Sequence, residues 1–256
     1  MFELIPGRIG QAGLLIVVIF AVFGASRVAL RRKVKPRTIP GVDMLEDWIR
    51  EAGKLGRPVF FTPGTEGVEY SDTLAALELL RYVSKVCVQC GVKLVVANED
   101  VNVQQVTEEI VKAAYTNAGK PQEYDPYSIR YISGSVFAYA AGVMGILRRE
   151  TPALNIFLGG FSAESLLIAE AGRTEALYQF GGTSSIEQLP FFLATCDHTL
   201  LAGELYAAQS YLTSDPKDIS WTVGQDAAKA IAILLVLVGV TLVSLGSNFL
   251  INLLKL

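Results

Sequence analysis

The sequence has few of the side chains that usually carry acid–base or metal chemistry. Its 256 residues include one histidine and three cysteines. A catalytic triad or a zinc site with several histidine ligands is therefore nearly excluded unless subunits share one. His198 follows Cys196 and Asp197 directly, but this segment reads as helical, and adjacent residues of a helix point about 100° apart. We expect a structural His198, hydrogen-bonded in the core or at an interface, and no catalytic residues.

The sequence also lacks the two common nucleotide-binding motifs. No glycine-rich turn fits the G-x-G-x-x-G fingerprint or the G-x-x-x-x-G-K-[ST] pattern. The net charge is −3 and the dense basic run adjoins an apolar segment, so a nucleic-acid-binding face is disfavoured. Cys87 and Cys90 form a C-x-x-C pattern near the end of a predicted helix, where the helix dipole disfavours a thiolate. We expect core thiols, no disulfide framework, no cofactor, no metal site and no nucleic-acid partner.

Charged residues are almost absent from two long runs near the ends of the sequence. Residues 10–30 are apolar except for Gln11, Ser26 and Arg27, and residues 230–254 carry no charge. Each run is long enough for a helix that crosses a hydrocarbon core of about 30 Å. The chain is 51% hydrophobic with a mean hydropathy of +0.39, which is too apolar for an ordinary soluble domain and too polar for a channel. We predict transmembrane helices at 10–30 and 230–254.

A basic run after the first apolar segment sets the predicted topology. Positive charges in this position indicate an anchor and not a cleaved signal peptide. The positive-inside rule places residues 31–229 in the cytoplasm and both termini, including the tail 1–9, outside the cell. The basic side chains would meet anionic head groups, so the lipid bilayer is a predicted partner. They lie in the predicted juxtamembrane linker 31–41 and are Arg31, Arg32, Lys33, Lys35 and Arg37.

Between the two apolar runs, strand and helix patterns alternate. The strands are continuously apolar, as in strands covered on both faces, and helices separate them. We therefore predict an α/β domain over 42–221 with a doubly wound parallel sheet (Rossmann-like), followed by a linker at 222–229 and inserted between two transmembrane helices. The predicted strands are 57–64, 92–100, 129–132, 155–160 and 177–180. The predicted helices are 42–55, 71–91, 102–119, 134–150, 162–172 and a long one over 185–212.

Two glycine-rich turns follow successive strands, in "NIFLGGFSAES" and "ALYQFGGTSS". Ligands of open parallel sheets bind beyond the carboxyl ends of the strands, where these turns and two further loops converge. Because none of the four loops contains Lys or Arg, a phosphate is disfavoured; carboxylates there could gather a hard cation, but acidic residues also cap helices. The candidate ligand-binding residues are Thr62, Gly64, Glu66, Glu99, Gly159, Gly160, Ser162, Glu164, Gly181, Gly182, Thr183 and Ser184.

Small and amide residues in the second apolar run suggest contacts between helices. Small residues permit close approach of two helices in a membrane, and amide side chains can hydrogen-bond across the contact. The candidate oligomerisation residues are Gly239, Ser244, Gly246 and Asn248. A position of Asn248 among the outer head groups is the alternative. The apolar segment "QLPFFLATCDHTLLAGELYAAQSYL" is also longer than one domain helix needs to bury, which favours a homo-oligomer or a complex with other membrane subunits.

Several segments resemble an uncharacterised prokaryotic family of membrane-anchored α/β domains of unknown function. They are "GRPVFFTPG", "YDPYSIRYIS", "FAYAAGVMGILRRETPALNIFLGGFSAESLLIAEAG" and the segment "QLPFFLATCDHTLLAGELYAAQSYL". The resemblance covers about residues 42–232. It implies the domain boundary and a location in a prokaryotic plasma membrane, and it implies no activity and no site.

Two functions are consistent with these patterns. In the first, a hairpin of membrane helices anchors an α/β scaffold that assembles, as a ring-like homo-oligomer or with partners, and is not an enzyme. In the second, the glycine-rich crevice binds a small polar molecule or is an active site, with Ser162, Glu164, Thr183 and Ser184 orienting the ligand. The scaffold predicts that side chains fill the crevice, whereas the second function predicts an open pocket.

Overall fold

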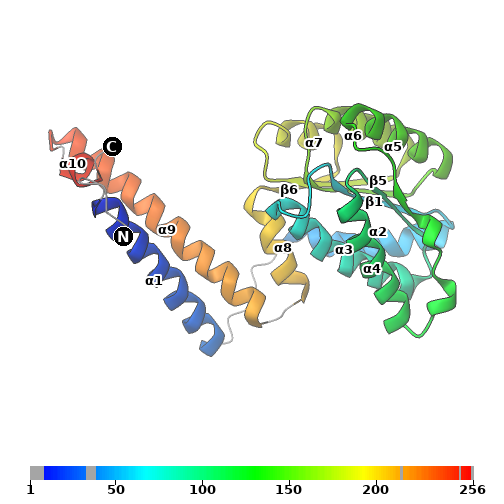
Figure 1. The fold of residues 1–256 in the computed structure, drawn as a ribbon, viewed down its shortest axis with the longest axis horizontal. Helices are drawn as coiled ribbons and strands as arrows, with labels where there is room; N and C mark the ends of the chain where they lie inside the picture. The colour runs from blue at the N-terminus through cyan, green and yellow to red at the C-terminus, as the bar shows by residue number, and fades with distance from the viewer. Residues whose placement is uncertain (1–8, 33–38, 214–215, 248, 255–256) are drawn as a thin grey trace, which may run out of the picture. The chain divides into compact units, whose positions relative to one another are not determined.

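The computed structural model describes residues 9–32, 39–213, 216–247 and 249–254. It divides into two compact units, one that comprises 1–36 with 213–256 and one that comprises 37–212 (Figure 1). The first unit is helical. The second is an α/β domain, and its limits lie close to the predicted 42–221.

The helical unit is a pair of long apolar helices, α1 (Ile9–Arg32) and α9 (Pro216–Ser244), with a short α10 (Phe249–Leu254). Both α1 and α9 are long and apolar enough to cross a membrane, and most of their large apolar side chains are exposed. The helices lie side by side (Figure 1). Gly224 allows their close approach, because a Cβ atom there would lie 2.4 Å from Ser26 Oγ. Phe23 meets Trp221 edge to face with ring centroids 6.1 Å apart.

The second apolar helix differs from the prediction at both ends. The expected linker 222–229 is helical, because α9 begins at Pro216 and continues through this segment, which is rich in good helix formers such as Ala and Gln. The expected span 230–254 is broken after Ser244, since Gly246 has a φ of +79°, a conformation that terminates helices. Gly246 therefore ends a helix. Of the predicted basic and oligomerisation residues, Lys33, Lys35, Arg37 and Asn248 lie outside the described residues.

The α/β domain is built on one sheet of six parallel strands in the order β3-β2-β1-β4-β5-β6. Since β1 lies beside both β2 and β4, the direction of winding reverses between β1 and β4, which confirms the predicted doubly wound, Rossmann-like sheet. The strands are β1 (Val59–Gly64), β2 (Leu94–Asn98), β3 (Ile129–Tyr131), β4 (Leu154–Gly160), β5 (Tyr178–Thr183) and β6 (His198–Leu201).

Helices cover both faces of the sheet (Figure 1). On one face, α2 (Pro40–Leu55), α3 (Ser71–Cys90), α4 (Val101–Asn117) and α8 (Gly203–Thr213) contribute to the larger apolar core. On the other face, α5 (Val136–Glu150), α6 (Glu164–Glu175) and α7 (Leu189–Thr195) form a second core around Tyr139 and Phe157. The predicted domain helix 134–150 is thus α5, and Cys87 is a buried core thiol as expected.

The predicted long helix at 185–212 is wrong. This segment folds as α7, then β6, then α8. The strand β6 lies at the sheet edge and pairs only with β5. Because it has only four residues, its sequence does not show an alternating pattern that could be told from the surrounding helical pattern. The turn into α8 passes through Ala202, whose φ is +42°.

Candidate functional site

The candidate residues from β1 and β4 lie together at the carboxyl ends of the strands, at the reversal point of the sheet. Gly64 pairs with Gly160 across the two strands. The backbone N–H of Thr65 donates to the Gly160 carbonyl over 2.9 Å, so the loop after β1 is fastened to the end of β4. Thr62 is buried below this point, and its hydroxyl contacts the hydroxyl of Tyr139 at 2.5 Å.

The glycines at this point are needed for close packing of the two strand ends. Gly159 has a φ of +119°, and a Cβ atom there would lie 2.0 Å from the carbonyl oxygen of Pro63. A Cβ atom on Gly160 would lie 1.9 Å from the carboxylate of Glu66. The space above these glycines is therefore taken by the chain itself, and Glu66 covers Gly160.

The second glycine pair, in β5, is also explained by packing. A Cβ atom on Gly181 would lie 2.9 Å from Cys196 Sγ, and one on Gly182 would lie 2.8 Å from the side chain of Leu158. Thr183 is buried, and its hydroxyl accepts a hydrogen bond from the Ser185 N–H over 3.2 Å. These glycines make room for neighbouring side chains.

Glu164 is the most enclosed acidic group of the crevice. Its Oε1 accepts hydrogen bonds from the Ser162 N–H at 2.9 Å and from the Thr65 hydroxyl at 2.8 Å, so it joins the loops after β1 and β4. The residue has no exposed surface. Within the described part of the chain, the other carboxylate oxygen, Oε2, is buried and has no hydrogen-bond donor. The expected capping role is not seen at Glu164, because α6 has no side-chain cap hydrogen bond, and the contacts of Oε1 leave Oε2 unexplained.

Two further candidate carboxylates, Glu66 and Glu99, are partly buried near Glu164. Burial raises the pKa of Glu66, and the charges of Asp72 and Glu69 raise it further. Burial likewise raises the pKa of Glu99, with added repulsion from Asp100 and Glu164. The carboxyl ends of the strands are thus a place where negative charge is already unfavourable.

A cluster around Asp72 was missed by the sequence reasoning. The buried Asp72 carboxylate accepts hydrogen bonds from the Ser184 N–H at 2.8 Å, from the Ser184 hydroxyl at 2.9 Å and from the Tyr206 hydroxyl. It thereby connects the start of α3 with the loop after β5 and with α8. The acidic residue in the first turn of α3 was visible as a helix-start signal, but its partners are more than 100 residues away and only the topology brings them near.

The triplet at 196–198 does not form a nucleophile and base. Burial raises the pKa of Cys196 to about 12, and Asp197 accepts a hydrogen bond from the Gln179 N–H at 2.8 Å. His198 stacks on Phe180 with ring centroids 5.4 Å apart, and its ring lies against Gly41. Its Nε2 is buried without a hydrogen-bond partner among the described residues, so this histidine packs in an apolar setting.

Because burial lowers the pKa of His198, the histidine should destabilise the domain in acid. The unfolded chain then binds the proton more readily than the folded chain, so stability falls as the pH falls through and below the unfolded pKa of about 6.5. Glu204 opposes this shift. We expect the melting temperature of the wild type to drop more between pH 7.5 and pH 5.5 than that of His198→Asn. Equal pH dependence of the two proteins would contradict this assignment.

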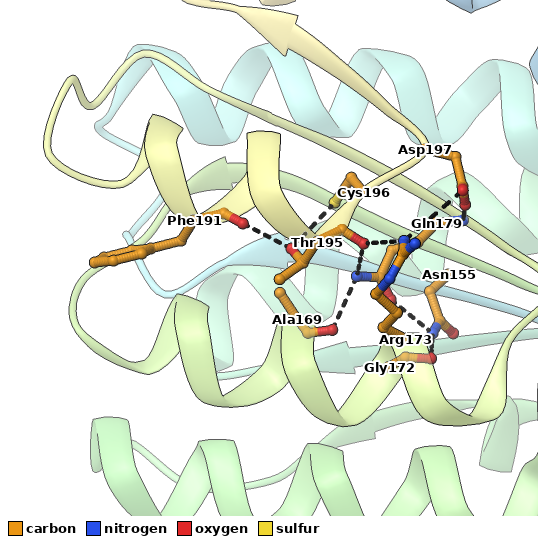
Figure 2. A network of polar contacts seen from close by, with 9 residues as sticks. All are labelled: Asn155, Ala169, Gly172, Arg173, Gln179, Phe191, Thr195, Cys196 and Asp197. Carbon is orange, nitrogen blue, oxygen red and sulfur yellow. Dashed lines mark hydrogen bonds and ion pairs between the residues drawn. The ribbon is translucent and has the colours of Figure 1, made fainter.

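The amino ends of β4 and β5 are held by a buried polar network (Figure 2). The Gln179 amide donates to the carbonyls of Ala169 at 2.9 Å and Thr195 at 3.2 Å. Its oxygen accepts from the Asn155 amide at 3.3 Å. Arg173 donates to the Thr195 carbonyl at 2.9 Å. The network fixes the strands whose opposite ends carry the candidate residues.

The charge at the carboxyl edge is of one sign. We define the carboxyl edge as the loops and first helical turns after the six strands: residues 65–72, 99–102, 132–137, 161–165, 184–188 and 202–204. These segments contain no Lys, Arg or His. Their carboxylates are Glu66, Glu69, Asp72, Glu99, Asp100, Glu164, Glu187 and Glu204. In the part of the chain that the structure describes, no group of three or more His, Cys, Asp or Glu side chains could hold a metal ion.

Two cavities lie elsewhere in the domain. A groove of about 380 Å³ runs between α3 and α4 and is lined by residues that include Arg81, Lys85 and Asn117. A second, of about 250 Å³, lies before β2 near Lys93 and Tyr115. Neither includes a candidate residue from the carboxyl edge.

Comparisons with known proteins give a family and no activity. No curated protein and no solved structure matches the chain. The family model described as "Domain of unknown function (DUF6754)" matches residues 7–254, which include both apolar helices and the whole α/β domain. The chain therefore belongs to the DUF6754 family of domains of unknown function.

Proposed function

We propose that the protein is a membrane-anchored scaffold that assembles into a homo-oligomer or into a complex with other membrane subunits. The observation that carries this proposal is the filling of the glycine-rich crevice. Gly159 and Gly160 lie against Pro63 and Glu66, and the β5 glycines lie against neighbouring side chains. Since Asp72 also links the surrounding loops, the polar groups there are used largely to hold the domain together.

The anchor in this proposal is the helical pair α1 and α9. In the apolar windows of these helices, 11% of α1 and 0% of α9 is buried, so nearly all of their apolar surface is available for lipid or for other helices. The basic run from Arg31 to Arg37 supports a cytoplasmic location for the α/β domain, with both termini on the other side of the membrane. A prokaryotic plasma membrane stays a prediction from the sequence resemblance.

The proposal predicts a defined oligomer or complex. The full chain, extracted in mild detergent, should have a mass of several subunits by native mass spectrometry and a closed shape in single-particle images of the same sample. Gly239→Leu should reduce the fraction of assembled protein, because Gly239 is a candidate small contact residue of α9. Gly24→Leu is the matched control, since a Cβ atom at Gly24 meets nothing within 4 Å among the described residues.

A monomeric wild type without other subunits would contradict the scaffold proposal. An oligomer that is insensitive to Gly239→Leu would keep the proposal and remove α9 as its contact. The ligand-binding alternative is supported by the buried Glu164 carboxylate, whose second oxygen has no hydrogen-bond donor in the described part of the chain.

A further inference from the structure

We propose that the carboxyl edge contains a binding site for a cationic nitrogen donor, a protonated amine or a guanidinium group, and that Glu164 is its central acceptor. This site goes beyond the scaffold role, which needs no ligand. It rests on three features of the described residues: the free oxygen of Glu164, the one-signed charge around it, and the apolar side chains that border it.

The first feature is the missing partner of Glu164 Oε2. Buried polar atoms in folded proteins nearly always have a hydrogen-bond partner, and a buried acceptor without one costs folding free energy. Oε1 already receives two donors, from Ser162 and Thr65, so the side chain is held in place and cannot turn to find another. A donor group that reaches Oε2 would remove this cost, and a charged donor would remove most of it.

The second feature is the charge of the surroundings. Glu99 and Glu66 are partly buried, and their pKa values are raised by burial and by nearby carboxylates. One positive charge placed among these groups would reduce the repulsion between all of them. No Lys, Arg or His of the carboxyl edge supplies that charge. A phosphate or another anion is disfavoured for the same reason.

The third feature is a border of exposed apolar side chains at the carboxyl edge. Tyr70, Val101 and Ile186 are exposed, and so is Phe137 in the first turn of α5. They follow β1, β2, β5 and β3, strands that lie on both sides of β4, which leads to Glu164. Aromatic and aliphatic side chains suit the hydrocarbon part of an amine or of a basic side chain, and an aromatic ring also attracts a cation.

A hydrogen-bonding cation fits better than a metal ion. Metal ions in proteins need several ligands in a fixed geometry, and no suitable group of three is present among the described residues. An ammonium or guanidinium needs fewer fixed partners, because it donates several hydrogen bonds in different directions. The site therefore predicts selectivity for organic amines over divalent metals.

The loop after β1 is bonded to the same carboxylate through the Thr65 hydroxyl, so a ligand that reaches Oε2 should disturb this loop. The loop begins at Gly64, whose φ is +91°, and includes Gly67. Binding should therefore change hydrogen exchange in residues 65–70 more than in the rest of the domain. This measurement separates binding at Glu164 from attraction to the exposed acidic surface.

The test uses the full chain in mild detergent, titrated by calorimetry with spermidine, with a short peptide of alternating Arg and Leu, and with Mg²⁺. Wild type should bind at least one of the two amine probes, and Glu164→Gln should weaken that binding at least tenfold. Glu170→Gln is the matched control, because Glu170 is exposed on the same helix. Glu99→Gln is the second variant in case Glu164→Gln does not fold, and it should weaken binding severalfold.

The two probes distinguish the source of the amine. Tighter binding of spermidine indicates a small molecule, and tighter binding of the peptide indicates a basic side chain of a partner protein. The proposal is overturned if neither probe binds, if all variants bind equally, or if Mg²⁺ binds with the same dependence on Glu164. Mass and amine binding are measured on the same sample, so failure here leaves the scaffold proposal to be judged by the oligomer alone.

Discussion

Gly159→Ala should destabilise the α/β domain by about 3 kcal/mol or more, which corresponds to a loss of roughly 6 to 12 °C in melting temperature for a domain of this size. Two costs add. The backbone φ of +119° is accessible essentially to glycine alone, and the new Cβ atom would lie 2.0 Å from the Pro63 carbonyl oxygen. That oxygen belongs to the backbone of β1 and cannot rotate away. A thermal melt followed by far-UV circular dichroism measures the effect.

The matched control is Gly160→Ala, one residue further along. A Cβ atom there would meet the carboxylate end of Glu66, which is flexible and can move towards solvent. We expect a loss of about 1 kcal/mol or less. If both substitutions cost the same, the close approach of β1 and β4 at Gly159 does not limit stability, and our explanation of the first glycine-rich turn is incorrect.

Gln179→Glu should cost about 3 to 5 kcal/mol at neutral pH, although the two side chains have nearly the same shape. The Gln179 amide donates to two carbonyl oxygens in a buried position (Figure 2). A carboxylate at this position has no N–H group to donate, and it would place a negative charge against the carbonyl oxygens of Ala169 and Thr195. Chemical denaturation of the variant and the wild type gives the difference in unfolding free energy.

The pH dependence of that difference identifies its cause. Burial raises the pKa of an acid in the folded state above its pKa in the unfolded chain. Stability is therefore lost as the pH rises through the folded-state pKa, and it is regained in acid. The deficit of Gln179→Glu should therefore shrink between pH 8 and pH 5. Gln105→Glu on the exposed face of α4 should change stability by less than about 0.5 kcal/mol at either pH. A deficit that does not change with pH would point to lost packing and not to buried charge.

The sheet was predictable because its strands are short apolar runs bounded by clear helix starts and stops. "VFF", "LVVA" and "NIFL" are buried on both faces, as their composition indicated. The helix after β2 begins at Val101 because Asp100 accepts hydrogen bonds from two backbone N–H groups of the first turn. Such local signals depend on neighbours in sequence, so they could be read without a structure.

The parts that could not be predicted depend on distant contacts. The strand β6 has only four residues and is defined by pairing with β5, not by its own pattern. The glycines pointed to a ligand site, yet their spacing could not show that Pro63, Glu66 and Cys196 occupy the adjacent space. The missing donor for Glu164 Oε2 likewise appears only when every neighbour is placed. The residue types therefore indicated where the candidate site lies. Which of its polar atoms lack a hydrogen-bond partner could be found only from the three-dimensional packing.

The contact between Asp43 and Tyr211 joins the beginning and the end of the α/β domain. Asp43 lies in the first turn of α2, and Tyr211 lies near the end of α8, and the tyrosine hydroxyl donates to the carboxylate. The two ends of the domain therefore lie next to each other. Adjacent ends allow a folded domain to be inserted into another protein, or removed from it, with little disturbance. In evolutionary terms, an α/β domain with adjacent ends can be exchanged as a single unit while the pair of flanking helices stays unchanged.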